Sequence, residues 1–422
     1  MPSEPSAVTG TAPSNPRRRA ARCWRGLAFA LGPGLIVMLA DTDAGNVVTA
    51  AQGGARFGYR LLPLILVLIP ALYAVQELTV RLGIFTGRGH GELIRERFGA
   101  RWAWLSAASL AAATLGSLVT EFSAVAGIGE LYGLSRGLTL PVAALALIAI
   151  VLTGSYRRVE RVALVIGCCE FAFIFVAWKS RPDLAAVARD AISMPFGDRK
   201  FMYLVAAVIG ATFNPWMVFY QQSAIADKGL RPRDYLVARW DTAAGAILTQ
   251  LLTGSVLVAA AASLGSAESN LASIGAISGA LTPVLGEGLG RAAFGIGVLG
   301  AALVAAIVSS LALAWGLGEV TGYRRSLELR PFEARWFYGV YSACVLGVAA
   351  LVFTVSDLVW LNIVAQVANA FLLPLVIGLL VTLAAKVLPE PVRLRGAYLW
   401  AVLGTTVIVC GVGIVGGFWG LL

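Results

Sequence analysis

The chain has 422 residues, of which 58% are hydrophobic and 13% are charged, and its mean hydropathy is +0.80. Soluble domains carry about 25% charged residues, so this composition excludes a water-soluble fold. It also excludes a disordered chain and a collagen-like repeat. The sequence therefore predicts an all-α polytopic membrane protein.

Eleven apolar runs are long enough to cross a bilayer, which takes about 20 residues per helix. Strict alternation of apolar and polar residues is absent, so a membrane barrel is not expected. Residues 1–25 are rich in Ser, Pro and Arg, and we expect a disordered cytoplasmic tail there. The predicted spans cover residues 26–52, 61–83, 102–132, 138–156, 159–178, 201–225, 240–264, 292–318, 336–355, 358–385 and 396–420.

The basic residues indicate the orientation of the chain. There are 33 Lys and Arg against 23 Asp and Glu, for a net charge of +10. With the amino terminus inside, 24 of these 33 basic residues lie on the inner side, where membrane proteins concentrate them. We expect an integral protein of the cell (inner) membrane, with its amino terminus cytoplasmic and its carboxyl terminus outside. The positive charge is then a topology signal, so no nucleic-acid partner is expected, and the lipid bilayer surrounds a monomer.

Two of the predicted spans, the first and the sixth, are interrupted at mid-membrane. A carboxylate there costs about 2.5–3.5 kcal/mol, and unwound backbone is tolerated only inside protein or beside a watery cavity. Matching breaks in two five-helix halves of opposite orientation predict an inverted-repeat transporter with a midplane site. The repeats would cover residues 26–178 and 201–385, with an additional helix over 396–420. The residues that interrupt the two spans are Asp41, Asp43, Gly45 and Asn46 in the first, and Gly210, Asn214 and Pro215 in the sixth.

At these residues the chain resembles the NRAMP metal-ion transporter family. The first motif of that family, Asp-Pro-Gly-Asn, stands here as Asp43-Ala44-Gly45-Asn46, and the second, Met-Pro-His, stands as Asn214-Pro215-Trp216. The likeness runs from about residue 31 to 374. It implies a LeuT-type fold of five plus five inverted helices, with helices 1 and 6 broken.

The resemblance also implies which groups bind the ion. They are the side chains of Asp43, Asn46 and Asn214, the last in place of the family's methionine, and the backbone carbonyls of Ala40 and Ala211. Thioether ligands favour late transition metals, whereas carboxylate, amide and carbonyl oxygens suit Mg²⁺ and Mn²⁺. We expect no cofactor, and the transported ion is Mg²⁺ or Mn²⁺.

The residues that couple the family's transport to protons are replaced here. Its two helix-6 histidines fall on Trp216 and Gln221, neither of which titrates near neutral pH. Glu121, Gln221 and Gln366 are candidates, beside Trp216, for holding the hydration water of the ion. For Glu121, a pair with a polar neighbour across the bundle is an equal alternative.

The Pro-Trp pair and the run Phe219-Tyr220-Gln221-Gln222 resemble the NRAMP-related magnesium transporter subgroup. That likeness implies uncoupled uptake of largely hydrated Mg²⁺, with Mn²⁺ also accepted, by alternating access. One alternative is an ordinary proton-coupled Mn²⁺/Fe²⁺ NRAMP transporter. Another is an organic-solute carrier of the same fold, for example one for amino acids. No catalytic motif is present, so an enzyme is not expected.

Four other polar residues have predicted places. Asp41 either lines the outer vestibule or makes a structural hydrogen bond. Glu77 and Glu170 are expected as polar contacts between packed helices. His90, the one histidine of the chain, is expected as a surface residue of a cytoplasmic loop.

Overall fold

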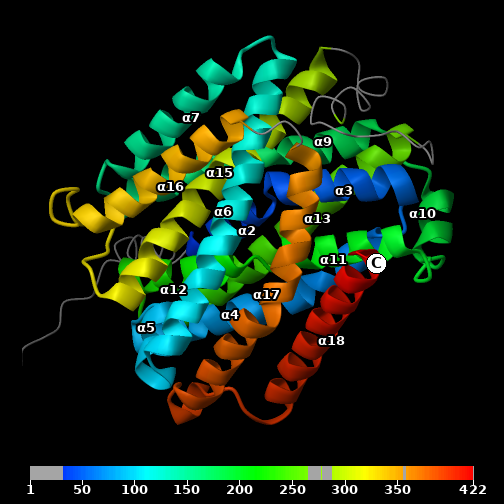
Figure 1. Ribbon diagram of the computed structural model, residues 1–422. Coiled ribbons are helices and arrows are strands. Elements are labelled where there is room, and N and C mark those ends of the chain that lie inside the picture. Colours follow the sequence, from blue (N-terminus) through cyan, green and yellow to red (C-terminus); the bar gives the residue numbers. More distant parts are fainter. Residues whose placement is uncertain (1–31, 265–276, 278–287, 355–357, 422) are drawn as a thin grey trace, which may run out of the picture.

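The computed structural model describes residues 32–264, 277, 288–354 and 358–421 (Figure 1). The predicted tail over 1–25 and the first residues of the first predicted span lie outside these ranges. Within the described ranges the chain forms helices, and nine helical segments are long and apolar enough to cross a membrane. In chain order these are α4 (Leu62–Thr86), α6 (Ala100–Leu131), α8 with η1 and α9 (Tyr156–Lys179), α11 with α12 (Arg199–Lys228), α13 (Tyr235–Leu264), α15 (Leu289–Thr321), α16 (Arg335–Thr354), α17 (Leu358–Lys386) and α18 (Gly396–Leu421).

Two further apolar segments are shorter. The helix α7 (Arg136–Val151) has 16 residues, and the first predicted span is divided into α2 (Pro33–Asp41) and α3 (Ala44–Phe57). Every predicted span overlaps a helix or a pair of helices in this set, which confirms the all-helical membrane architecture. Two short helices, α5 (His90–Phe98) and α10 (Leu184–Ala191), belong to connections between spans.

Both predicted breaks are present. The first lies between α2, which ends at Asp41, and α3, which begins at Ala44. The second lies between α11 (Arg199–Thr212) and α12 (Pro215–Lys228). Pro215 is the first residue of α12, where its missing N–H and fixed φ favour a helix start. The predicted span over 159–178 differs from expectation, because a 3₁₀ turn, η1 (Cys168–Phe171), separates α8 (Tyr156–Gly167) from α9 (Ala172–Lys179).

Two glycines bring the broken helices against α17 (Figure 1). A Cβ atom on Gly210 of α11 would lie 1.8 Å from the backbone oxygen of Gln366, and one on Gly45 of α3 would lie 1.9 Å from the Nε2 atom of the same glutamine. At Gly210 any larger residue would meet backbone and separate α11 from α17, whereas at Gly45 the flexible amide of Gln366 would have to move. The half-helices α3 and α11 therefore both contact α17 at Gln366.

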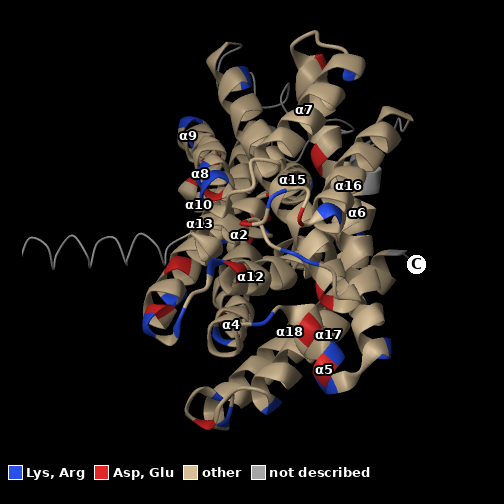
Figure 2. Cartoon of the chain, turned by 90° about the vertical axis from the view of Figure 1, so that its left-hand side faces the viewer, with Lys and Arg blue, Asp and Glu red and all other residues tan. Residues whose placement is uncertain are grey.

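Charged residues gather on loops and helix ends of the face that carries α5, as Figure 2 shows. The carboxyl ends of α4, α12 and α15 meet there around a pocket, which Glu92 and Arg325 line. Under the orientation predicted from the basic residues, this face is the cytoplasmic one. The carboxyl ends of α3 and α13 and the helix α10 lie at the opposite end of the bundle, beside a second pocket.

Candidate metal-ion site

The first break places Asp43 at the amino end of α3, where it is fully buried. Its Oδ1 atom accepts a hydrogen bond of 2.7 Å from the backbone N–H of Asn46, which has no partner within the helix. The Oδ2 atom faces the second break, 3.5 Å from the Nδ2 atom of Asn214. One oxygen of Asp43 thus caps the helix while the other is directed to the opposite break.

The two breaks leave the backbone carbonyls of Ala40 and Ala211, which the family resemblance implies as ligands, without their usual helical hydrogen bonds. In a continuous helix the carbonyl of Ala211 would accept from residue 215, but Pro215 has no N–H. The carbonyl of Ala211 instead accepts from the side-chain amides of Asn214 at 2.8 Å and Asn46 at 3.2 Å. The carbonyl of Ala40 loses its usual partner in the same way, because α2 ends before Ala44. Both carbonyls can therefore take part in binding at the breaks.

Glu121 of α6 lies at the same helix terminus. Its Oε2 atom accepts from the backbone N–H of Ala44 at 3.1 Å, and its Oε1 atom accepts from the hydroxyl of Thr120 at 3.2 Å. Of the ion pairs formed by described residues, none includes Asp43 or Glu121. Two buried carboxylates without a basic partner are costly. A bound divalent cation would supply the missing positive charge.

The helix α17 contributes amides to the site, and sequence analysis found one of them and missed another. Gln366 is fully buried against α3, and its Nε2 atom has no hydrogen-bond partner among the described residues. Asn369, which sequence analysis missed, donates to Oδ1 of Asn214 at 2.6 Å and to Oε1 of Gln366 at 3.2 Å. Residues three apart share a helix face, so the spacing of Gln366 and Asn369 could have revealed the second residue.

Two predicted residues have other surroundings. The amide of Gln221 accepts from the hydroxyl of Thr79 at 2.6 Å and donates to the hydroxyl of Thr242 at 2.8 Å, so it links α12 to α4 and α13. The structure does not join it to the residues at the breaks. Trp216 is fully buried in the first turn of α12, and within the part of the chain that the structure describes its indole N–H has no hydrogen-bond partner.

Asp41 and Glu170 lie on the other side of the first break. The hydroxyl of Thr249 donates to Oδ2 of Asp41 at 3.3 Å, which is the structural hydrogen bond considered for this residue. Glu170 is fully buried within the 3₁₀ turn η1 and makes no hydrogen bond of normal geometry, although the side chain of Thr42 is near. Glu77 bonds to side chains of α13 and α18, so it is a contact between packed helices as predicted.

The prediction for His90 is wrong. The side chain is fully buried at the start of α5, where its Nδ1 atom lies 3.1 Å from Oε1 of Gln222 and its ring meets Phe219 edge to face. The arginines of the surrounding sequence suggested a solvated loop, but α5 packs inward against α12 and α15. Burial lowers the pKa of His90 to about 4, although the hydrogen bond with Gln222 acts in the opposite direction.

Hydrogen bonds join neighbouring helices on the α5 side. The hydroxyl of Ser223 in α12 donates to Oε1 of Glu319 in α15 at 2.5 Å, and Oε2 of Glu319 accepts from the backbone N–H of Gly91 at 2.8 Å. The carboxylate of Asp241 in α13 accepts from the backbone N–H groups of Gly34 at 2.8 Å and of two neighbouring residues at the start of α2. These contacts fix both broken helices to their neighbours.

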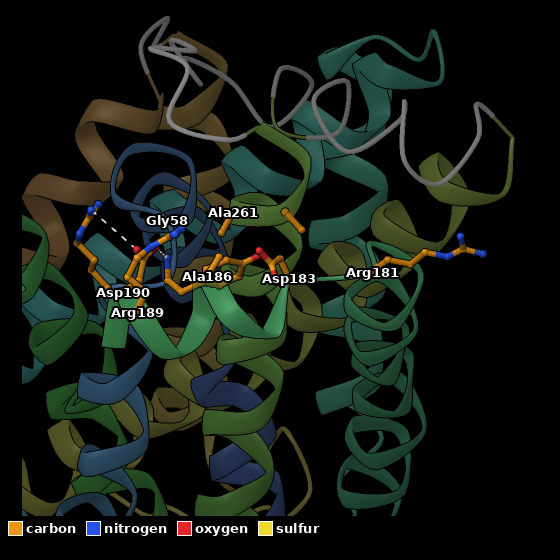
Figure 3. Close-up of a pocket in the computed structure, with 10 residues that line it drawn as sticks. Gly58, Arg181, Asp183, Ala186, Arg189, Asp190 and Ala261 are labelled. Carbon is orange, nitrogen blue, oxygen red and sulfur yellow. Dashed lines mark hydrogen bonds and ion pairs between the residues drawn. The ribbon is translucent and has the colours of Figure 1, made fainter. Parts of the chain in front are cut away.

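At the opposite end, α10 is attached to the segment that follows α3 (Figure 3). The Oδ2 atom of Asp190 accepts from the backbone N–H of Tyr59 at 3.1 Å, and its Oδ1 atom is 3.9 Å from the guanidinium of Arg60. Gly58 has a positive φ of 62°, which brings its backbone close to Asp190. The side chain of Arg181 points away from this cluster (Figure 3). The cavity between α3, α10 and α13 measures about 420 Å³.

Solved structures share this fold. A crystal structure of the manganese transporter of Eremococcus coleocola superposes with a TM-score of 0.76 and 19% identity, covering 96% of this chain and 88% of that one. MHP1, a nucleobase-cation-symport-1 family transporter, gives a TM-score of 0.56 with 16% identity over 92% and 90% of the two chains. The broken helices and these superpositions therefore place the chain in the LeuT-type fold class.

The family model of natural resistance-associated macrophage protein-like proteins (Nramp) matches residues 34–418. The chain belongs to the Nramp family, whose members are metal-ion transporters and not enzymes. It is 30% identical to the divalent metal cation transporter MntH 1 of Pseudomonas aeruginosa over 297 residues, 66% of each chain. It is also 30% identical to MntH of Yersinia pestis over 295 residues, 67% of this chain and 70% of that one. The match thus spans about two thirds of the length of these relatives.

Proposed function

We propose that this protein transports divalent metal ions across the cell membrane by alternating access, and that Mg²⁺ is the preferred ion, with Mn²⁺ also accepted. The observation that carries the proposal is the pair of buried carboxylates, Asp43 and Glu121, at one helix terminus without a basic partner. An ion of charge +2 balances both carboxylates, whereas a monovalent ion leaves one charge unpaired.

The choice of Mg²⁺ rests on the donor atoms at the breaks. Asp43 offers a carboxylate oxygen, the carbonyls of Ala40 and Ala211 are released by the breaks, and Asn46 and Asn214 carry amide oxygens. A half turn of either terminal amide exchanges its oxygen for its nitrogen, so both side chains can present oxygen to a cation. Hard oxygen donors of this kind suit Mg²⁺ and Mn²⁺, and none of them selects a softer metal.

Hydration accounts for the amides that lie at the site beside Asp43 and Glu121. Mg²⁺ requires octahedral oxygen at about 2.0–2.1 Å and loses water reluctantly. Amides can donate to or accept from a retained water molecule, and Gln366 and Asn369 supply such groups from α17. Water bound to a cation donates through its outward hydrogens, so the amide oxygen Oε1 of Gln366 is the atom of this side chain that can hold a hydration water. We therefore propose that the ion crosses with part of its water attached.

We further propose that uptake is not coupled to protons. The side chains on α12 that correspond to the family's histidines are Trp216 and Gln221, and neither can carry a proton at physiological pH. His90 makes its contacts with Gln222 and Phe219, away from the two breaks. A negative cytoplasm lowers the free energy of an entering divalent ion by about 4.6 kcal/mol per 100 mV. The membrane potential alone can then drive uptake.

A second candidate function is proton-coupled transport of Mn²⁺. It is favoured by the solved neighbour that is a manganese transporter and by Glu121, a carboxylate that could bind a proton beside Asp43. The two functions differ in whether pH inside a vesicle changes as metal enters.

The deciding experiment uses the full chain in liposomes that contain an Mg²⁺-sensitive dye, with internal pH recorded in parallel. We expect Mg²⁺ to enter when a potassium diffusion potential makes the interior negative, without acidification. Liposomes carrying the Asp43→Asn variant are the control for leak. Entry of Mn²⁺ with protons, and no entry of Mg²⁺, would replace the first function by the second.

A further inference from the structure

An apolar groove of about 440 Å³ runs along the outer surface of the bundle between α4, α11 and α18. Its walls include Leu64 and Ala74 of α4 and Ala401 and Val412 of α18. Ten residues of helix separate Leu64 from Ala74, so the groove is about 15 Å long. Its rim is exposed, as Val67, with 68% of its surface accessible, shows. In a membrane this groove faces lipid.

One end of the groove is basic. Tyr398 lines the groove, and the guanidinium of Arg81 lies 5.4 Å from the centre of its ring. Arg239 donates to the hydroxyl of Tyr73 at 3.2 Å, next to the groove residue Ala74. Both arginines also contact Glu77, at 2.7 Å and 3.6 Å. Two guanidinium groups around one buried carboxylate leave a positive charge at this end.

The segment before α18 adds further positive charge. It carries Arg393 and the exposed Arg395 against a single acidic residue, Glu390. The carbonyl of Val392 accepts from Arg81 at 3.1 Å, which holds this segment beside the basic end of the groove. Trp400 is 73% exposed nearby on α18, as is typical of a residue at the level of the lipid headgroups.

We infer that this groove binds an anionic phospholipid, with an acyl chain along α4 and α18 and the phosphate headgroup beside Arg239 and Arg395. Basic groups next to an apolar groove at headgroup height are the features that recognise such lipids in other membrane proteins. The side chain of Arg81 is only 12% exposed, so it shapes the site, whereas Arg239, which is 38% exposed despite its contacts with Tyr73 and Glu77, and the exposed Arg395 are accessible to the headgroup. A zwitterionic lipid fits the groove equally well and gains less from these two residues.

The bound lipid also contacts a moving part of the transporter. Ile209 of α11 lines the groove, two residues before Ala211, whose carbonyl faces the ion site. Lipid in the groove therefore touches the half-helix that forms the second break. The groove therefore gives the bilayer a contact with α11, two residues from Ala211.

The test is native mass spectrometry of the delipidated full chain, titrated with phosphatidylglycerol or with phosphatidylcholine of identical acyl chains. The wild-type protein is expected to retain one phosphatidylglycerol per chain more tightly than phosphatidylcholine. In the double variant Arg239→Gln/Arg395→Gln, phosphatidylglycerol affinity should fall about 30-fold, which is about 1 kcal/mol for each basic residue, and approach that of phosphatidylcholine. The variant Ala401→Trp fills the groove and should weaken both lipids alike.

Two control variants match these changes elsewhere. Arg101→Gln removes an exposed arginine on the α5 side, and Val165→Trp adds an indole on the exposed face of α8. Both controls should bind phosphatidylglycerol like the wild type. Equal binding of the two lipids by the wild-type protein would overturn the inference, as would equal losses in controls and test variants. If Ala401→Trp fails to fold, the charge variants alone decide, because their positions are on the surface.

Discussion

The substitution Asp43→Asn tests the site most directly, because it removes a charge and leaves the shape of the side chain unchanged. The Oδ1 atom of Asp43 accepts from the backbone N–H of Asn46 at 2.7 Å, and the amide oxygen of asparagine can do the same. The start of α3 should therefore be preserved. What is lost is the negative charge that Oδ2 presents to the second break.

The size of the effect follows from the burial of the site. A unit charge and a divalent ion about 4 Å apart attract by about 8 kcal/mol at an effective dielectric of 20, and desolvation offsets much of this. Removing one partner of a buried ion pair costs about 3–5 kcal/mol in measured cases. We expect the affinity for Mg²⁺ and the rate of uptake at low Mg²⁺ to fall by roughly 150-fold or more.

The assay is dye-monitored Mg²⁺ uptake into liposomes, with thermal unfolding in detergent to verify the fold. Asp41→Asn is the matched control, since Asp41 is equally buried, lies two residues away and hydrogen-bonds to Thr249 rather than to the second break. It should retain uptake within a few-fold of the wild type. Wild-type kinetics in Asp43→Asn, or equal losses in both variants, would refute the assignment of Asp43.

Three further predictions concern the second break, helix packing and pH. Asn214→Met places a thioether opposite Asp43 and should raise the preference for Mn²⁺ over Mg²⁺ in competition uptake; an unchanged ratio would mean that residue 214 does not reach the ion. Gly210→Ala puts a methyl group 1.8 Å from the backbone oxygen of Gln366, so it should destabilise the fold by about 1–3 kcal/mol and lower the unfolding temperature. The control Gly339→Ala adds a methyl group in open space and should leave the unfolding temperature unchanged. His90 is buried and its pKa is lowered to about 4, so protonation of this residue favours the unfolded chain. The contribution of His90 to the free energy of unfolding is constant above pH 6.5, and about 3 kcal/mol of it is lost between pH 6.5 and 4. The variant His90→Gln should remove that part of the pH dependence of thermal unfolding, and an unaltered profile would show that the loss has another source.

The sequence was sufficient to predict the helices and both breaks. A membrane helix is recognised from the length and apolarity of its own segment. A break is recognised from residues at the break itself, here Pro215 and the polar residues around Asp43. Each of these signals lies within one turn of the residue it affects. The 3₁₀ turn at Glu170 has no such local signal, and it was not predicted.

The structure brings together at the breaks the residues that the motifs name, whereas sequence analysis missed polar partners that tertiary packing supplies. The hydrogen bond from Asn369 to Asn214 joins residues far apart in sequence, and periodicity on α17 indicates a polar face without giving its partner. The burial of His90 depends on α5 folding back against α12 and α15, which a loop rich in arginine does not reveal. Gln221 was predicted from its place in a motif as a holder of hydration water, and packing gives its amide Thr79 and Thr242 as partners, which the motif does not indicate.

The contacts of α17 suggest how ion binding is linked to alternating access. Through Gly45 and Gly210, both half-helices that carry proposed ligands rest on Gln366, so α3 and α11 cannot move apart without leaving α17. An ion held between Asp43 and the carbonyl of Ala211 adds attraction across the same gap. A ligand shifts a conformational equilibrium only by its difference in affinity between two states. An ion bound there would therefore stabilise the arrangement in which α3 and α11 both contact Gln366, by as much as their separation would weaken its binding.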